Sequence, residues 1–464
     1  MVHRLNFLAP ACSCFLLLGL GLNHASALER RSEFELIDTI YLGGVRPTNN
    51  QKSNYPNLNT RLILDEISSY LEFRFHIEAG LALNNAAFHY FDLPEAYLGT
   101  SRAWSPLQIH AGRKLEPWSK IDDVWFQGYF QPRTRWEYFD PDPAGLLGLF
   151  GSYREPGIEA VLFASPIFVP EQRACAINAD GTFNVDSPWC VPVDETANFK
   201  GQKARIAYRI DTPPVTSLVA HPGVAARLRV GKRLGPWVQT AYAFKPMNQL
   251  LIGIDAPYAT ENERVETIIY PRVVYHQLVS NEVGYEGDTW GASMSGLYER
   301  PIRDHTNSNW TTEEIGPVVA VSPMGWVKPF GLGRHDPKLS LAYLRQLGGP
   351  EPDQGKLAAG KGSFFETRMM YREAVRADVQ TGFPWRWARP IATRLSLIRD
   401  LNIEATHVST EIAYVSPNSW TARVGADFIG VEQTDRTVFE TQEPQFLNRY
   451  KANDRVLVGV SYAF

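Results

Sequence analysis

The sequence predicts an all-β protein: a single antiparallel β-barrel of about 18 strands, with 16 or 20 as the neighbouring even numbers, that crosses a membrane. Several segments alternate apolar and polar residues with a period of two, as strands do when their faces meet different surroundings. Short turn-like segments alternate with long polar ones. After residue 28, no apolar stretch approaches the roughly 20 residues that a spanning helix needs.

The first 27 residues are expected to be a secretory signal peptide. Arg4 precedes an apolar run from Cys12 to Leu22, and Ala25-Ser26-Ala27 forms a small-x-small cleavage site. We expect the mature chain to begin near Leu28 and residues 28–464 to form one barrel domain. At about 24 residues per strand with its connection, this length corresponds to roughly 18 strands.

The composition is compatible with a membrane barrel and also with a soluble protein. Charged residues make up 21% of the chain, which is ordinary for a soluble protein. A membrane barrel can have the same composition, because its apolar lipid-facing residues and polar lumen-facing residues cancel in the average. The 12 Trp, 20 Tyr and 24 Phe residues are enough for two interfacial girdles. A net charge of −4 gives no reason to expect nucleic acid as a partner.

The clearest internal strand is Ser69–Leu83, where seven apolar residues alternate with a face that carries Glu72, Arg74 and Glu78. Similar alternation occurs around 371–380, 407–414 and 420–428. A charged face opposite an apolar face suits a wet lumen and lipid, although a soluble sheet could divide its faces in the same way. The long polar segments expected as outer loops are Arg46–Asn59, Arg303–Glu314, Gly348–Gly362 and Gln433–Arg449.

The last strand predicts where the barrel closes. Val456, Val458, Val460, Tyr462 and Phe464 share one face, and the other face is small or polar except for Leu457. This pattern resembles the C-terminal strand of Gram-negative outer-membrane β-barrels, whose terminal aromatic residue is part of an assembly signal. The resemblance implies an outer-membrane location and three partners: the lipid bilayer, lipopolysaccharide and the barrel-assembly machinery. An edge strand of a soluble sandwich is the alternative.

The segment His110–Phe130 departs from the strand pattern. Its Gly-Arg strand end, followed by a loop that contains Trp and Asp, resembles general porins and the alginate-export barrel, in which such loops fold inward. The resemblance implies a constriction loop; an ordinary extracellular loop is the alternative. The residues expected in the constriction are Arg113, Lys114, Trp118, Asp122, Asp123 and Trp125.

Arginine is the most notable polar residue on the predicted lumen faces. Because arginine stays charged and binds carboxylates and phosphates bidentately, such a lumen would favour anions, including acidic polysaccharides. Alternatively, the charges satisfy one another and stiffen the wall. The predicted pore-lining residues are Glu72, Arg74, Glu78, Arg227, Arg229, Arg372, Arg376, Asp378, Arg394, Glu411, Arg423 and Asp427.

Cys175 and Cys190 are the two cysteines that remain after cleavage, and they lie in one long Asn-, Asp- and Gly-rich loop. An exported protein with two such cysteines is expected to join them in a disulfide. No metal site is expected, because this segment lacks histidine and the spacing does not match a zinc motif.

The function that the sequence favours is a passive outer-membrane channel for solutes, or a conduit for a secreted, possibly anionic polysaccharide with periplasmic secretion partners. A scaffold barrel that binds partner proteins through its loops is the alternative from another class. No cofactor is expected. Catalysis is disfavoured, because neither a Gly-x-Ser-x-Gly nor a His-Glu-x-x-His motif occurs.

Overall fold

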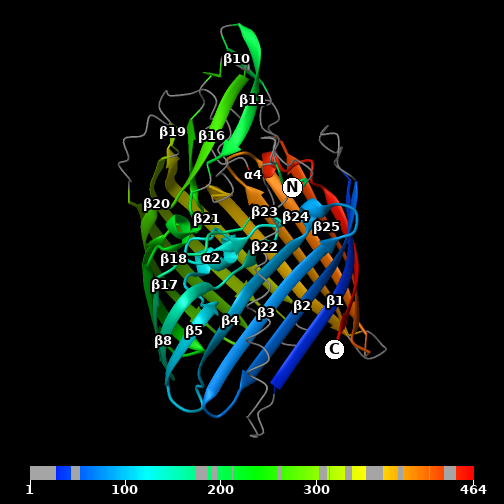
Figure 1. The fold of residues 1–464 in the computed structure, drawn as a ribbon. Coiled ribbons are helices and arrows are strands. Elements are labelled where there is room, and N and C mark those ends of the chain that lie inside the picture. Colours follow the sequence, from blue (N-terminus) through cyan, green and yellow to red (C-terminus); the bar gives the residue numbers. More distant parts are fainter. Residues whose placement is uncertain are drawn as a thin grey trace, which may run out of the picture.

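The computed structural model describes residues 28–42, 53–172, 187–190, 196–199, 201–211, 213–255, 258–259, 264–302, 311–312, 314–329, 337–351, 369–384, 390–416, 418–432 and 446–464. Eighteen antiparallel strands form one closed barrel, as the sequence predicts (Figure 1). Each strand pairs with the next barrel strand along the chain, and the last, β26, pairs with β1. Closure satisfies the backbone groups that an open sheet would leave unpaired at its edges.

The barrel strands run from β1 to β26, and the labels missing from their series belong to the loops. Their bounds are β1 (Leu28–Tyr41), β2 (Asn54–Ile67), β3 (Leu71–Ala82), β4 (Tyr90–Thr100), β5 (Leu107–Lys114), β8 (Leu146–Glu155), β9 (Ile158–Ser165), β12 (Gly223–Gly231), β13 (Gly235–Pro246), β17 (Tyr275–Glu286), β18 (Trp290–Pro301), β20 (Glu314–Val327), β21 (Lys338–Glu351), β22 (Glu373–Pro384), β23 (Pro390–Asp400), β24 (Ala405–Val415), β25 (Trp420–Val431) and β26 (Arg455–Ala463).

The outer surface of the barrel is an apolar belt. Along each strand, large apolar side chains that are exposed alternate with residues that face the interior, as the period of two requires. The belt runs around the whole circumference. Its members include Leu36, Leu98, Ile109, Leu162, Val238, Val283, Leu341, Ile412, Val424 and Val460. Such a surface suits lipid rather than water.

The seam between β1 and β26 is closed by the last residue. Phe464 and Ser32 exchange two backbone hydrogen bonds, of 3.0 and 2.9 Å. The ring of Phe464 stacks on Phe34 at 5.6 Å and on Tyr462 at 5.8 Å, and Trp420 lies 4.8 Å from Tyr462. All four rings are exposed on the outer surface, where they form part of an aromatic girdle at the rim of the short turns.

The opposite rim carries the long connections. A smaller sheet extends beyond this rim in Figure 1, where most of its strands are labelled. It consists of β10 (Thr196–Phe199), β11 (Gln202–Ile210), β14 (Leu251–Asp255), β15 (Tyr258–Ala259), β16 (Arg264–Arg272) and β19 (Thr311–Thr312). The remaining elements are η1 (Ala86–Phe88), α2 (Lys120–Trp125), β6 (Arg133–Thr134), β7 (Asp142–Pro143), α3 (Val215–Val219) and α4 (Phe446–Arg449).

None of the helices described is long and apolar enough to cross a membrane.

Three of the predicted loops are shorter than expected. Strand β2 begins at Asn54, β20 at Glu314, and β21 continues to Glu351. The start of β2 is rich in asparagine, which is typical of a loop but is tolerated where a strand faces a wet lumen. The alternation predicted around 371–380 begins later in the structure: Tyr371 and Arg372 precede β22, and Tyr371 is buried in the interior.

Candidate functional site

The segment 115–145, which connects β5 to β8, lies inside the barrel. Its helix α2 is seen at mid-height within the strands in Figure 1. Asp122 holds the segment in shape, because its carboxylate accepts the backbone N–H groups of Tyr129 and Phe130, both at 2.8 Å. Phe126 ends the helix with a positive φ of 54° and thereby reverses the chain. We call this segment the inner loop.

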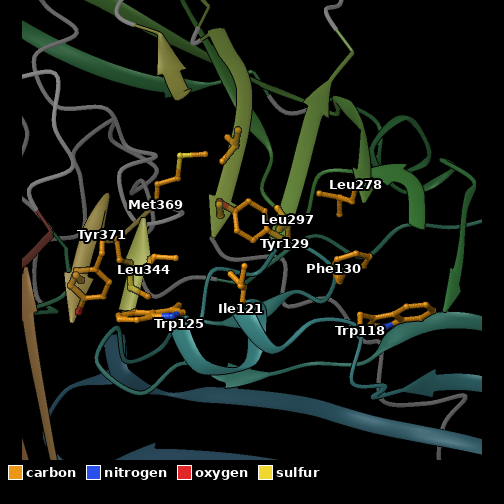
Figure 2. Packing of buried hydrophobic residues seen from close by; sticks show 14 of the residues in the cluster. Trp118, Ile121, Trp125, Tyr129, Phe130, Leu278, Leu297, Leu344, Met369 and Tyr371 are labelled. Carbon is orange, nitrogen blue, oxygen red and sulfur yellow. The ribbon is translucent and has the colours of Figure 1, made fainter. Parts of the chain in front are cut away.

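Apolar side chains of the inner loop pack against one half of the barrel wall (Figure 2). Trp118, Ile121 and Trp125 are at most 1% exposed. Trp118 stacks on Phe130 with ring centroids 6.0 Å apart, and Trp125 meets Tyr371 edge to face. The wall residues beneath are small or aliphatic, and include Ala241, Ala243, Leu278, Leu297, Val318, Ala320, Leu344 and Ala374. The filled half is therefore a hydrophobic core inside a barrel.

Hydrogen bonds from the same wall fix the loop. Glu282 of β17 accepts the Lys120 backbone N–H at 2.7 Å and the Ser119 hydroxyl at 3.1 Å, both at the start of α2. The Trp125 indole N–H donates to Ser322 of β20 at 3.0 Å. Farther along, the Tyr129 hydroxyl donates to Gln346 of β21 at 2.9 Å. A loop attached at so many points is expected to be rigid.

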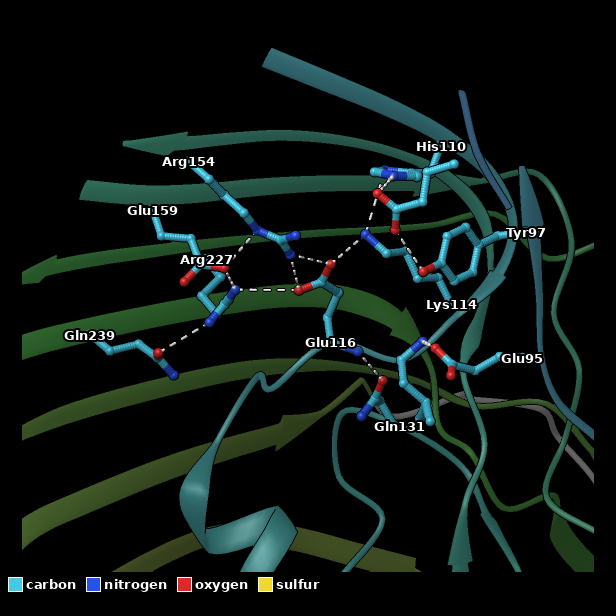
Figure 3. Close-up of polar contacts among 12 residues, drawn as sticks. Glu95, Tyr97, His110, Lys114, Glu116, Gln131, Arg154, Glu159, Arg227 and Gln239 are labelled. Atoms are coloured by element: carbon cyan, nitrogen blue, oxygen red, sulfur yellow. Dashed lines mark hydrogen bonds and ion pairs between the residues drawn. The ribbon is translucent and has the colours of Figure 1, made fainter. Parts of the chain in front are cut away.

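A charge network holds the base of the inner loop (Figure 3). Glu116, which is 2% exposed, is bound by Lys114 at 2.8 Å and Arg154 at 2.9 Å. Arg227 reaches the same carboxylate at 3.3 Å and Glu159 at 2.7 Å. Because each buried charge here has an opposite charge beside it, the network avoids the cost of an isolated buried ion.

The other half of the interior is open. A cavity of about 480 Å³ lies between the inner loop and strands β1–β4 and β22–β26. It is called the outer chamber here because its lining includes Tyr41 and Tyr55, at the ends of β1 and β2 nearest the long loops. The charged residues of its lining are Glu33, Glu35, Arg61, Glu78, Glu137, Asp140, Asp142, Arg376, Arg394, Glu411, Arg423, Asp427 and Arg455.

A second cavity, of about 410 Å³, lies beneath α2 and is called the inner chamber. Three residues line both chambers: Phe126, Arg376 and Arg394. Arg376 donates to the Val124 carbonyl at 2.6 Å, and its guanidinium lies 5.1 Å from the centre of the Phe126 ring. Arg133 lies over the same ring at 5.5 Å. Two cation–π contacts thus hold Phe126 where the chambers meet.

The predicted pore-lining residues divide into two groups. Seven line at least one of the chambers: Glu78, Arg376, Asp378, Arg394, Glu411, Arg423 and Asp427. The other five line neither: Glu72, Arg74, Arg227, Arg229 and Arg372. Glu72 accepts a hydrogen bond from Tyr97, and Arg74 pairs with Glu95 at 2.8 Å. Arg227 is covered by the inner loop, and Arg229 lies over the ring of Trp237 at 4.3 Å.

The predicted constriction residues play different parts in the inner loop. Trp118, Asp122 and Trp125 are buried and hold its shape, as described above, and Lys114 belongs to the charge network. Arg113 donates to the Gly145 carbonyl at 3.1 Å, where the loop returns to the wall. Asp123 alone of the six lines a chamber, the inner one, with its side chain 46% exposed.

The loop cysteines are described only in part. Cys190 is buried and disulfide-bonded. Cys175 lies outside the described residues, so the pairing of these two cysteines stays a prediction. Among the residues that the structure describes, no group of three or more His, Cys, Asp or Glu side chains is arranged to hold a metal ion.

Sequence reasoning missed Phe126, Glu116, Glu282 and the loop carboxylates Asp140 and Asp142. One available signal lay in the wall. Many inward positions of β13, β17, β18 and β20 carry Ala, Ser or Leu, as at Ala241, Ser280 and Leu297, where an open lumen would carry charge. A run of small or apolar inward residues on adjacent strands indicates that something packs against them.

Asp142 has a perturbed pKa. Its side chain lies in the enclosed outer chamber, where removal from bulk water and the nearby carboxylates Glu78 and Asp140 raise its pKa to about 7. Arg61 opposes this shift. The carboxyl group therefore exchanges its proton near neutral pH.

Comparisons with known proteins give matches in structure alone: no protein-family model and no curated protein matches the sequence. OccK9 (OpdG) of Pseudomonas aeruginosa is 10% identical, with 95% of this chain and 98% of that chain covered and a TM-score of 0.48. OccAB3 of Acinetobacter baumannii is 10% identical, with 95% and 99% covered and a TM-score of 0.46. A mutant porin of Rh. blastica is 9% identical, with 94% and 100% covered and a TM-score of 0.37.

Proposed function

We propose that this protein is an outer-membrane channel through which small polar solutes diffuse passively. The observation that carries the proposal is the pair of chambers, which meet at Phe126, Arg376 and Arg394 inside a closed barrel with an apolar outer belt. A polar interior enclosed by a lipid-facing wall is the arrangement of a diffusion channel.

The inner loop is proposed to act as the constriction. It fills one half of the interior and leaves Phe126 and Asp123 facing the open half. Chambers of about 480 and 410 Å³ have the volume of small-molecule sites, which favours small solutes over a polysaccharide chain. A scaffold that binds partners through its loops is the alternative, and it would not need connected chambers.

The surroundings of the barrel are proposed from its surface. The apolar belt would contact the bilayer, and lipopolysaccharide would surround the rim of the long loops. Tyr462 and Phe464 lie at the closing seam, exposed on the outer surface, and we propose that the assembly machinery reads this end of the chain. Periplasmic secretion partners are not part of this proposal.

Reconstitution in a planar bilayer tests the function. Protein folded in detergent should first migrate on a gel as a compact species that boiling converts to the unfolded form. The same protein should then open stable channels, and a neutral sugar small enough to enter the chambers should reduce their current. Compact, heat-modifiable protein that never conducts would refute the channel and favour the scaffold.

A further inference from the structure

We infer that the channel prefers small cations to anions, a selectivity that deepens the proposed function and rests on it. Among the residues that the structure describes, the outer chamber is lined by eight carboxylates against five guanidinium groups, an excess of three negative charges when histidine is neutral. The abundance of arginine in the sequence favoured anions, but charge balance at the chamber surface decides which ion enters.

The arginines of the outer chamber are largely neutralised by carboxylates. Arg61 binds Glu78 at 2.6 Å, and Arg423 binds Glu35 at 2.5 Å. Arg455 binds Asp427 at 2.7 Å and also binds Glu137. Arg376 binds both oxygens of Asp378, at 2.8 and 3.0 Å. A guanidinium already held by carboxylates offers a passing anion little. Within the described part of the chain, Arg394 is the one arginine of this lining outside any ion pair.

Two carboxylates of the outer chamber have no such neutralising partner. Asp140 and Asp142 lie on the inner loop with exposed side chains, and no Lys, Arg or His of the described residues lies within ion-pair distance of either. Their field is focused by the enclosing low-dielectric wall, which raises the local concentration of cations.

Aromatic rings near these carboxylates also favour cations over anions. Tyr90 and Trp136 line the outer chamber and stack on each other with centroids 5.8 Å apart. The backbone of Asp142 pairs with that of Thr134, two residues before Trp136. Because the faces of aromatic rings attract cations, these two rings would stabilise a positively charged solute beside the unpaired carboxylates.

The inner chamber is close to balanced and does not reverse this preference. Its described lining has four basic groups, Lys120, Lys338, Arg376 and Arg394, and three acidic ones, Asp123, Glu286 and Asp378. Two of these basic groups, Arg376 and Arg394, also line the outer chamber and are already counted there. The outer chamber therefore sets the sign of selectivity.

The test is the reversal potential of single channels in a KCl gradient, at about 0.1 M on the dilute side so that charges are not fully screened. At about pH 8, above the pKa of about 7 of Asp142, the wild type should be more permeable to K⁺ than to Cl⁻. The double variant Asp140→Asn/Asp142→Asn should lower the permeability ratio about twofold or more. Arg394→Gln should raise it.

Glu155→Gln/Asp288→Asn is the matched control, because it removes two exposed carboxylates that line neither chamber, one at the end of β8 and one on the short turn after β17. Its ratio should equal that of the wild type. A wild-type channel that prefers Cl⁻, or an unchanged ratio in the Asp140→Asn/Asp142→Asn variant, would overturn the inference and leave the channel itself intact. Folded protein without conductance would overturn the channel and the inference with it.

Discussion

The two halves of the barrel interior are built on different principles. Behind the inner loop, the strands from β8 to β22 present small and aliphatic residues, and the loop covers them with Trp118, Trp125 and Phe130 at 0 to 1% exposure. On the other side, β1–β4 and β22–β26 present paired charges to an open chamber. One wall is thus the base of a hydrophobic core, and the other is the lining of an open chamber.

This difference explains how a barrel of this size can hold a narrow path with a fixed shape. An 18-stranded ring encloses more space than side chains alone can fill. Apolar packing on one side gives the loop a stable base, and polar bonds to Glu282, Ser322 and Gln346 fix its position. The loop then presents Phe126, Asp140 and Asp142 to the open side as a rigid surface.

Of the changes that test the contrast between the filled and open halves, Asp122→Ala is expected to have the largest effect. The carboxylate of Asp122 is 3% exposed and accepts the backbone N–H groups of Tyr129 and Phe130, two residues that are themselves fully buried. Its loss should destabilise the inner loop by about 3 kcal/mol. Single-channel recordings should then show larger and noisier currents, and protease should cut the loop faster.

Asp123→Ala is the matched control, because the neighbouring carboxylate is 46% exposed and lines the inner chamber. It should change stability by at most about 0.5 kcal/mol. Equal noise and equal cleavage in the two variants would show that the loop does not depend on Asp122, and the contrast between a core and a lining would fail.

A smaller effect is expected from Phe126→Ala. Removing the ring at the junction of the chambers should widen the path and raise single-channel conductance by roughly half. Phe130→Ala removes the same group from the filled half, where it is fully buried, and should lower stability by about 3–5 kcal/mol without widening the path. The comparison fails if both variants raise conductance equally.

The sequence predicts the barrel wall well because each strand carries its own two-residue period. The terminal strand, the charged face of β3 and the number of strands all follow from local pattern and length. The same alternation explains why seven predicted lumen residues line a chamber. A strand fixes the side to which a residue points, whatever lies opposite.

The division of the interior could not be predicted, because it depends on a loop that meets strands far away in sequence. Arg227 faces inward as its strand position requires, but Glu116, 111 residues earlier, covers it. Trp125 finds its partner 197 residues away at Ser322. A single sequence gives no account of such pairs, so covered and open lumen residues look alike.

The smallest effect is expected from pH, and it concerns the open half alone. The pKa of Asp142 is raised to about 7 by its enclosure, so its carboxyl group is charged above this pH and neutral below it. Cation preference should therefore fall as pH is lowered through 7. The groups that face Asp142 are Glu78 from β3, Arg61 from β2, Tyr90 from β4, and Glu137 and Asp140 from the inner loop.

Reversal potentials between about pH 8 and pH 5.5 measure this change, which should be a modest fraction of the total selectivity because seven other carboxylates line the chamber. Asp142→Asn in the wild-type background isolates the part of this change that is due to the Asp142 carboxyl group. That variant should show a smaller change with pH. If it keeps the full wild-type dependence, then another group controls the response, and Asp142 does not tune the open half.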